Sequence, residues 1–268
     1  MAEINRGLIL EENQRKNAKR RHRVTLLLML ILAVGVVLIL NQQATSLWMR
    51  YVYRPQLAVT LNQQTILQNQ KKAAQQTSSH TTGANDGVNE HINLGDVINS
   101  KKYYHEVAGN IIGAIYLPTA GEVSLPILNG GIDKNVQKKN MNIGASTPMT
   151  GLIIGKSPNF SLGAHNMWTP GVMFTSITNM KNGDEFYLTD TKKVYVYKVY
   201  QQLEVTPQQT EIFDKVPGKK IVTLYTCNHD GDKREVVRGQ YAYQVAYAKA
   251  DKSITHKFNF SKQQKVDL

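Results

Sequence analysis

Hydrophobic positions follow two different patterns along the chain. Residues 24–40 form one uncharged, almost entirely apolar run directly after the basic cluster at 19–23. As a helix rising about 1.5 Å per residue, this run would be roughly 26 Å long, slightly less than the roughly 30 Å hydrocarbon core of a bilayer. The pattern therefore predicts a transmembrane signal anchor, and the basic cluster predicts that residues 1–23 stay in the cytoplasm.

A cleaved signal peptide is the competing interpretation of the apolar run. The run is longer than the about 7–15 apolar residues of a signal peptide, and no Ala-x-Ala-like cleavage site follows it. We therefore expect an uncleaved single-pass anchor in the cell membrane, with the rest of the chain outside the cell. Residues 41–102 predict an extracellular stalk and linker: 41–68 mix Gln with scattered apolar residues and favour a stalk helix, and 69–90 have too little apolar content to pack.

From about Tyr103 the pattern changes to short β-prone runs separated by turn residues. Eight runs have the length of strands: Ile111–Leu117, Ser124–Leu128, Leu152–Ile154, Phe160–Ala164, Glu185–Leu188, Val194–Tyr200, Ile221–Thr226 and Tyr241–Ala248. They predict a mainly β domain, a barrel or a sandwich, over residues 103–250. We expect short helices at Asp133–Lys139 and Pro170–Met180. The polar residues 251–268 predict a loose tail.

Composition and charge exclude some classes of function and some kinds of site. The net charge of +12 comes from scattered lysines and the basic N-terminal region, without the interleaved arginines and aromatic residues of a nucleic-acid-binding surface. We therefore expect no nucleic acid partner. The single cysteine excludes an intramolecular disulfide and a cysteine-type zinc site. In an exported domain, a lone thiol is either a reactive group or one half of a bridge to another chain.

That cysteine, Cys227, ends the β-prone run Ile221–Thr226 and is followed by a polar turn. A buried structural cysteine is the alternative interpretation. A nucleophilic thiol needs a histidine or a nearby positive charge to reach the thiolate form. His165 also ends a β-prone run, so we favour it as the partner over His229, which lies in the turn after the cysteine.

Arg234, seven residues after the cysteine, is the candidate positive charge. A fixed guanidinium beside a thiolate can hold a substrate carbonyl or a developing oxyanion, whereas an ordinary surface charge is the alternative. In a strand, Arg238 would share a face with Arg234, and Lys233 would face the other way. Arg238 is therefore the second candidate for this role.

The segment Thr223-Leu224-Tyr225-Thr226-Cys227, with Arg234 downstream and His165 in Leu162-Gly163-Ala164-His165 upstream, resembles the sortase family of cysteine transpeptidases. The family signature is Thr-Leu-x-Thr-Cys, an arginine several residues later and a histidine about sixty residues earlier. The runs at 234–239 and 181–184 are also similar to family segments. The resemblance covers about residues 107–250 and implies an eight-stranded sortase-type β-barrel with short helices.

The resemblance also implies a reaction. Cys227 would attack the Thr–Gly bond of a Leu-Pro-x-Thr-Gly sorting signal in a secreted protein and form a thioester. An amine, usually the cross-bridge of lipid II, would resolve the thioester and attach the protein to peptidoglycan. His165 would act as general acid and then base, Arg234 would position the substrate and stabilise the oxyanion, and Thr226 would contact the substrate. The segment from about Thr206 to Lys219 would cover the sorting signal.

Within the family, a single N-terminal anchor, no C-terminal span and no long insertion before the cysteine strand are similar to the housekeeping class A enzymes. A class D enzyme is the alternative. Some class A members bind calcium, but Glu122 and Asp133 offer few oxygen ligands here, so we expect no metal and no cofactor. Two readings lie outside the family: a membrane-tethered binding module with a structural thiol, and a papain-type peptidase, in which the cysteine precedes the histidine.

Overall fold

The chain divides into two compact units, 1–48 and 49–268, each described here by itself. The computed structural model describes residues 15, 17, 19–37, 63–76, 107–131, 134–167 and 169–258.

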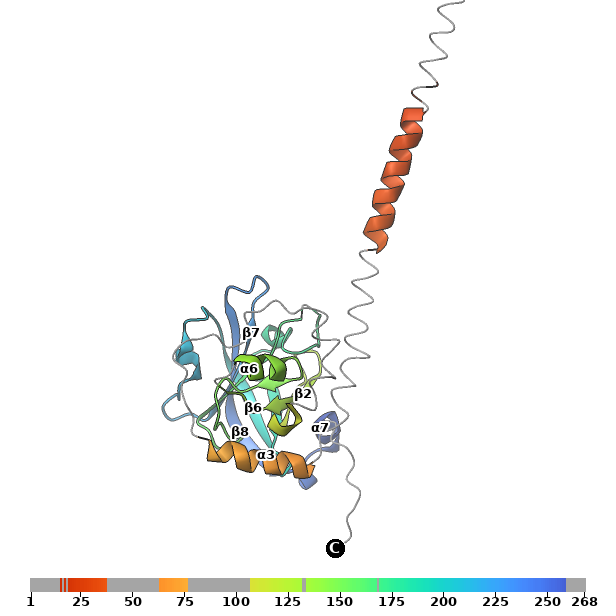
Figure 1. The fold of residues 1–268 in the computed structure, drawn as a ribbon. Coiled ribbons are helices and arrows are strands. Elements are labelled where there is room, and N and C mark those ends of the chain that lie inside the picture. The colour runs from red at the N-terminus through yellow and green to blue at the C-terminus, as the bar shows by residue number, and fades with distance from the viewer. Residues whose placement is uncertain are drawn as a thin grey trace, which may run out of the picture. The chain divides into compact units, whose positions relative to one another are not determined.

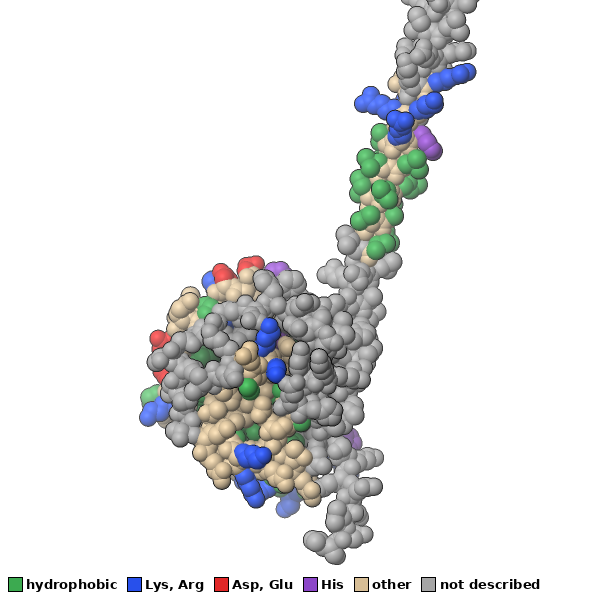
Figure 2. All heavy atoms as spheres, in the orientation of Figure 1, with side chains coloured by type: hydrophobic (Ala, Val, Ile, Leu, Met, Phe, Trp, Pro, Cys, Tyr) green, Lys and Arg blue, Asp and Glu red, His purple; other side chains and the backbone are tan. Residues whose placement is uncertain are grey.

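In the first unit, residues 19–37 are helical. Apolar side chains between Val24 and Val37 are exposed along this helix, and Lys and Arg side chains gather at its N-terminal end (Figure 2). Among the described residues, no helix combines the length and the apolar character that a membrane crossing requires. Residues 38–40 of the predicted anchor lie outside the described residues.

The second unit is built around a closed barrel, in which eight strands are described (Figure 1). The strands are β1 (Ile111–Leu117), β2 (Val123–Leu128), β3 (Ala145–Ser146), β4 (Asn159–Gly163), β5 (Glu185–Thr189), β6 (Lys193–Val205), β7 (Ile221–Cys227) and β8 (Arg234–Ala246). Neighbours follow the order β1-β2-β3-β4-β7-β8-β6-β5. Pairs β2–β3 and β4–β7 are parallel, and the others are antiparallel. The predicted eight-stranded β-barrel is confirmed.

β-Branched and aromatic residues occupy the strands because their side chains pack well on a pleated, half-buried surface. All seven residues of β1 are buried, as are the first six of β7. In the core, Phe186 of β5 stacks on Tyr197 of β6, with ring centroids 5.6 Å apart. Gly239 of β8 lies against Phe186, where a Cβ atom would come within 2.2 Å of the ring, so this position has no room for a side chain.

Helices cover parts of the barrel. The described α-helices of this unit are α3 (Gln63–Gln75), α6 (Lys134–Met141) and α7 (Lys252–Thr255). The 3₁₀ helices are η3 (Ala108–Asn110), η4 (Ile177–Asn179), η5 (Thr210–Phe213), η6 (Tyr247–Lys249) and η7 (His256–Phe258). The short helix predicted at Asp133–Lys139 is confirmed as α6, two residues longer at its C-terminal end.

The structure corrects the predicted linker that begins at residue 69, because α3 continues to Gln75 and packs on β1. Ile66 and Ala73 are buried, and the Asn69 amide donates to the Ala108 and Ile111 carbonyls, both at 2.9 Å. These bonds let a polar side chain lie in the interface. The rest of the predicted linker, residues 77–90, lies outside the described residues.

Three other local predictions differ from the structure. Leu152–Ile154 is in a turn region and not a strand, and the eighth strand is the two-residue β3. Pro170–Met180 consists mainly of turns with a single 3₁₀ turn at η4. The predicted loose tail is wrong for residues 251–258, because Phe258 is 1% exposed and packs by Tyr247. Residues 259–268 lie outside the described residues.

Candidate active site

Three strands bring the candidate residues to one end of the barrel. Cys227 and Arg234 lie directly opposite each other in the antiparallel pair β7–β8. On the other side of β7, Gly163 of β4 pairs with Tyr225, and His165 follows two residues later. Because residues two apart along a strand share a face, His165, Cys227 and Arg234 form one row across three neighbouring strands. We refer to these three residues as the Cys227 row.

Hydrogen bonds hold the backbone around His165 on both sides. The Ala164 N–H donates to the Tyr225 carbonyl at 3.3 Å, and the Ala164 carbonyl accepts from the Thr226 hydroxyl at 2.8 Å. The His165 carbonyl accepts from the Phe174 N–H at 3.0 Å. His165 is 4% exposed. Its imidazole therefore starts from a rigid backbone at the same level as the thiol, as a positioned acid or base requires.

Asn166 adds a link that sequence reasoning missed. Its Nδ2 donates to the backbone carbonyl of Cys227 at 3.1 Å, so the residue after the histidine holds the backbone of the cysteine. The bond joins segments 61 positions apart in sequence. A short polar residue beside a candidate histidine was the only available signal, and it gains meaning only once β4 and β7 are known to pair.

Arg234 places a permanent positive charge in the row. Its side chain is only 1% exposed, and Nη1 donates to the Lys233 carbonyl at 3.1 Å. A guanidinium stays protonated in proteins, and in a water-poor site its charge acts more strongly than in bulk solvent. It can therefore favour a thiolate or a developing oxyanion nearby. Cys227 is a free thiol of intermediate exposure, which leaves it open to a substrate.

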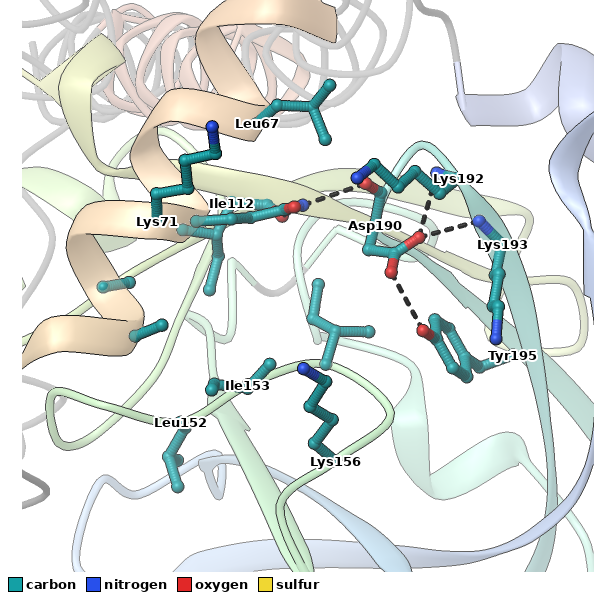
Figure 3. Close-up of a pocket in the computed structure, with 14 residues that line it drawn as sticks. Leu67, Lys71, Ile112, Leu152, Ile153, Lys156, Asp190, Lys192, Lys193 and Tyr195 are labelled. Carbon is teal, nitrogen blue, oxygen red and sulfur yellow. Dashed lines mark hydrogen bonds between the residues drawn. The ribbon is translucent and has the colours of Figure 1, made fainter.

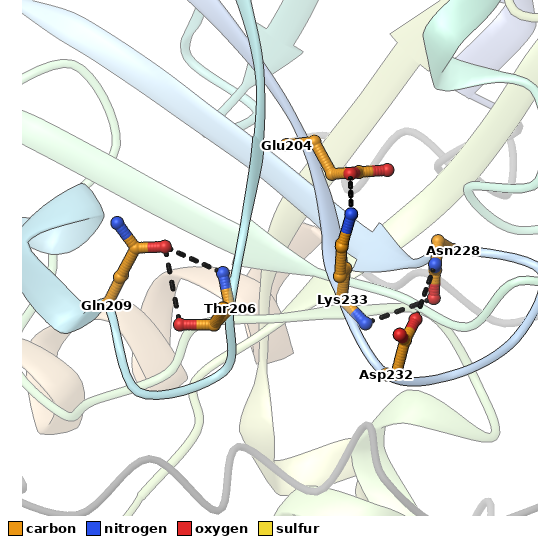
Figure 4. Close-up of polar contacts among 6 residues, drawn as sticks. All are labelled: Glu204, Thr206, Gln209, Asn228, Asp232 and Lys233. Atoms are coloured by element: carbon orange, nitrogen blue, oxygen red, sulfur yellow. Dashed lines mark hydrogen bonds and ion pairs between the residues drawn. The ribbon is translucent and has the colours of Figure 1, made fainter.

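The turn after Cys227 is held by its own side chains (Figure 4). Asn228 Oδ1 accepts from the Lys233 N–H at 3.1 Å, and Asn228 Nδ2 donates to Asp232 at 2.8 Å. Lys233 forms an ion pair with Glu204 on β6. Burial and the neighbouring Glu204 carboxylate raise the pKa of Glu235 above its ordinary value. Glu204 and Glu235 pair across β6 and β8 on the face of this strand end opposite the Cys227 row.

The structure also places the other three candidates from the sequence, His229, Arg238 and Thr226. His229 is exposed in the turn after Cys227. Arg238 pairs with Thr223, four residues from the row, and therefore shares a face with Arg234. Thr226 is fully buried, and its hydroxyl is used in the bond to Ala164. This bond gives Thr226 a part in aligning the histidine strand, and its predicted contact with substrate stays a prediction.

An apolar surface lies beside the thiol, and we refer to it as the wall. Cys227 packs against a buried cluster that comprises Met141, Val205, Ile212, Tyr225 and Val236. Ile212 belongs to η5, in the connection between β6 and β7. In the same helix, Phe213 meets the Tyr225 ring edge-on, with centroids 5.1 Å apart. The β6–β7 connection therefore forms one side of the surface next to the thiol.

Comparison with known proteins agrees with this geometry. A family model of the sortase domain matches residues 115–242, which include every strand from β4 to β7 and the whole Cys227 row. The match assigns residues 115–242 to the sortase domain family. Sortase homologues are cysteine transpeptidases, so this sortase domain is that of a cysteine transpeptidase. The family is associated with the cell surface and acts on proteins that carry cell-wall sorting signals.

Individual relatives support the same family. Sortase A of Streptococcus agalactiae is 26% identical over 87% of this chain and 90% of its own length. Sortase A of Bacillus anthracis is 38% identical over 48% of this chain and 59% of its own length. Among solved structures, sortase C-3 from Streptococcus pneumoniae shares the fold, with a TM-score of 0.51, 14% identity and coverage of 81% of this chain and all of that one.

A pocket of about 460 Å³ lies elsewhere on the sortase domain, between α3 and the turn from β5 to β6 (Figure 3). Asp190 there accepts hydrogen bonds from the N–H groups of Lys192 and Lys193 and from the Tyr195 hydroxyl. Lys193 pairs with Ala246 at the end of β8, whereas Arg234 begins that strand. The pocket and the Cys227 row thus lie at opposite ends of β8, and the pocket is not part of the candidate site.

No metal site is apparent within the described part of the sortase domain, where no three His, Cys, Asp or Glu side chains gather closely enough to hold an ion. Glu122 instead forms an exposed ion pair with Lys257 at 3.2 Å. Asp133, the other residue considered for calcium, lies outside the described residues. The expectation of an enzyme without a metal or cofactor stays a prediction.

Proposed function

We propose that this sortase domain cleaves a Leu-Pro-x-Thr-Gly sorting signal between Thr and Gly and transfers the acyl part to an amine of a peptidoglycan precursor such as lipid II. The observation that carries the proposal is the Cys227 row, in which a thiol, an imidazole and a buried guanidinium occupy one level of three adjacent strands. Acyl transfer by a thiol needs a nucleophile, a proton donor and an oxyanion stabiliser.

In the first half of the reaction, the Cys227 thiolate adds to the carbonyl carbon of the signal's threonine. Arg234 stabilises the negative charge that develops on the carbonyl oxygen. The C–N bond to glycine then breaks, and His165 gives its proton to the leaving amine. The products are a thioester between the threonine and Cys227 and a free N-terminal glycine peptide.

In the second half, an incoming amine adds to the thioester carbonyl, and His165 takes the proton that the amine loses. The C–S bond breaks and returns the Cys227 thiolate, so no oxidant or reductant is consumed. An apolar wall beside the thiol supports transfer over hydrolysis, because it limits the access of water to the thioester.

We also propose that residues 24–40 anchor the chain as a single N-terminal span, with residues 1–23 in the cytoplasm and the sortase domain outside the cell. The proposal rests on the uncharged run and the basic residues before it, and on the exposed apolar side chains of the helix at 19–37. Attachment of a sortase domain to the outer surface of the membrane would place it where secreted proteins and lipid-linked cell-wall precursors meet.

We assign the protein to class A rather than class D because the relatives from Streptococcus agalactiae and Bacillus anthracis are both named sortase A. A housekeeping enzyme of this class would accept several different proteins that carry the same short signal. Sorting signals from several secreted proteins should therefore react at comparable rates.

The test uses the full chain in detergent micelles, because a fragment of residues 103–250 would lose α3 and Phe258, which pack on the barrel. A Leu-Pro-Ala-Thr-Gly peptide is incubated with and without triglycine, and the products are identified by mass spectrometry. We expect a Thr-Gly-Gly-Gly product when triglycine is present and slower hydrolysis without it. Cleavage that Cys227→Ala leaves undiminished would overturn the proposal, as would hydrolysis that triglycine does not divert.

A further inference from the structure

A buried polar network lies two rows below Cys227 on the same face of β4, β7 and β8. Asn159, the first residue of β4, is 4% exposed. Its Nδ2 donates to the Ile212 carbonyl at 2.9 Å and to the Asp214 carbonyl at 2.8 Å. Its Oδ1 accepts from the Thr223 hydroxyl at 2.8 Å and from the Ser161 hydroxyl at 3.2 Å. The Asn159 nitrogen thus faces hydrogen-bond acceptors and its oxygen faces donors, and these bonds fix the orientation of the amide.

Arg238 completes the network from β8. Its Nη2 donates to the same Ile212 carbonyl at 3.1 Å, and its Nη1 donates to Gln201 on β6 at 3.3 Å. Arg238 pairs with Thr223 across β7–β8. The Ile212 carbonyl therefore receives an amide donor from β4 and a charged donor from β8, and a charge-assisted bond is stronger than a neutral one.

The segment held by these bonds has little stability of its own. η5 is a 3₁₀ helix of only four residues, Thr210–Phe213, between Val205 of β6 and Ile221 of β7. A single short turn is not stable in isolation, so its position depends on contacts with the barrel. Ile212, whose carbonyl is held by the network, also packs in the apolar cluster that touches Cys227.

We propose that Asn159, Thr223 and Arg238 form a polar clamp that fixes the β6–β7 connection beside the thiol and so determines how well a sorting signal binds. The clamp residues act through Ile212 and the wall that it belongs to, so they are positioning residues and not catalytic ones. The proposal rests on the proposed function, because it assigns the wall beside Cys227 to recognition of the peptide. The proposal gives the two arginines different roles: Arg234 acts in the chemical step, and Arg238 acts in peptide binding.

The test compares Thr223→Val and Arg238→Gln with the full wild-type chain. Thr223→Val removes the hydroxyl that donates to Asn159, Arg238→Gln removes the guanidinium that donates to Ile212 and Gln201, and both leave the Cys227 row intact. We expect KM for the Leu-Pro-Ala-Thr-Gly peptide to rise about tenfold, since a weakened hydrogen-bond network costs roughly one decade of binding. We expect kcat to change by less than about twofold, because uniform binding is lost and not the chemistry. Arg238→Lys, which keeps the charge, should recover part of the lost affinity.

Thr189→Val is the matched control. Thr189 is equally buried and its hydroxyl donates to the Lys193 carbonyl at 2.7 Å, but it lies at the far end of β5. Thr189→Val should lower the thermal stability by about as much as Thr223→Val does, without changing KM. If KM rises in both threonine variants in proportion to their loss of thermal stability, the clamp has only a structural role and the proposal is overturned.

Amide hydrogen exchange of residues 206–220 gives a readout that needs no activity. We expect exchange in this segment to become about fivefold faster in the clamp variants and to stay unchanged in Thr189→Val. Unchanged exchange in the clamp variants would refute the clamp, and faster exchange with an unchanged KM would refute its part in recognition. If the wild-type chain cleaves no sorting peptide, the proposed function fails, and the exchange data alone decide whether the clamp exists.

Discussion

The side chain of Asn166 donates a 3.1 Å hydrogen bond to the backbone carbonyl of Cys227. This bond ties the residue after His165 to the nucleophile itself, and it bridges β4 and β7 at the point where their named strands end. The relative position of imidazole and thiol therefore depends on a group that takes no part in proton transfer.

Asn166→Ala should lower kcat about tenfold to a hundredfold, because a misalignment of about 1 Å between reacting groups can cost two decades in rate. KM should change little, since the wall beside the thiol is untouched. Steady-state kinetics with the sorting peptide provide the measurement. Asn179→Ala makes the same chemical change at an exposed position and should behave as wild type. Equal kinetics for both variants would mean that the bond does not align the site.

The two histidines near Cys227 in sequence or space should differ sharply. His165→Ala should reduce kcat by about a thousandfold or more, in the range expected for loss of a positioned general acid and base. His229→Ala should have a small effect, because His229 is exposed in the turn. Single-turnover cleavage of the sorting peptide measures both variants. The reverse ranking would show that the proton donor is His229.

Arg234→Lys keeps the charge but loses the fork of guanidinium donors. Because Arg234 lies opposite Cys227, we expect a fall in kcat of about a hundredfold to a thousandfold, as for loss of an oxyanion donor. The corresponding change at Arg238 should instead affect KM. Kinetic parameters of the two lysine variants, measured side by side, test this division, and a kcat effect confined to Arg238→Lys would contradict it.

Local sequence was enough to predict the strands that carry Cys227 and lead to His165, whereas the run predicted at Tyr241–Ala248 covers only the second half of β8, which begins at Arg234. Cys227 ends a run of β-prone residues, and the prediction of a strand there needed no information from the rest of the chain. The pairing of β4 with β7 is parallel and joins residues about sixty positions apart, so no local pattern reports it. The bond from Asn166 and the clamp around Ile212 depend on that pairing, and for this reason sequence reasoning missed them.

The part of α3 from residue 69 onward was missed for a different reason. Its sequence is rich in Gln and Lys, and the buried face includes Asn69 beside Ile66 and Ala73. Hydrophobic periodicity treats a buried asparagine as a break in the apolar stripe. Here the amide satisfies two carbonyls next to β1, so its burial is compatible with a packed helix.

Tyr187 predicts a defined response to alkaline pH. Burial and the hydrogen bond that its hydroxyl donates to Glu185 raise its pKa to about 12. Because the folded state holds this proton more tightly, the stabilisation is complete below the ordinary pKa of 10.0 and is lost as pH rises through about 12. In Tyr187→Phe, thermal stability should fall less steeply between these values than in wild type. Tyr200→Phe, at a half-buried tyrosine of β6, is the control, and equal slopes for wild type and Tyr187→Phe would contradict the prediction.

Gly163 lies in the row between the Cys227 row and the clamp, and its lack of a side chain makes room for Tyr225. A Cβ atom at this position would come within 2.4 Å of the Tyr225 ring. The ring is fully buried and contacts Phe213 of η5, so its displacement would disturb neighbouring packed side chains. Gly163→Ala should therefore destabilise the fold by about 1–3 kcal/mol, the usual cost of overpacking.

The same substitution should also disturb function, because displacement of Tyr225 moves the wall beside the thiol. Thermal unfolding and the KM of the sorting peptide are measured together. Gly109→Ala is the matched control, since a Cβ atom there meets no atom of the described residues within 4 Å. It should be as stable as wild type or slightly more so, because alanine restricts the unfolded chain. If Gly163→Ala is as stable as Gly109→Ala, the close approach of Tyr225 to β4 is not what holds the wall in place.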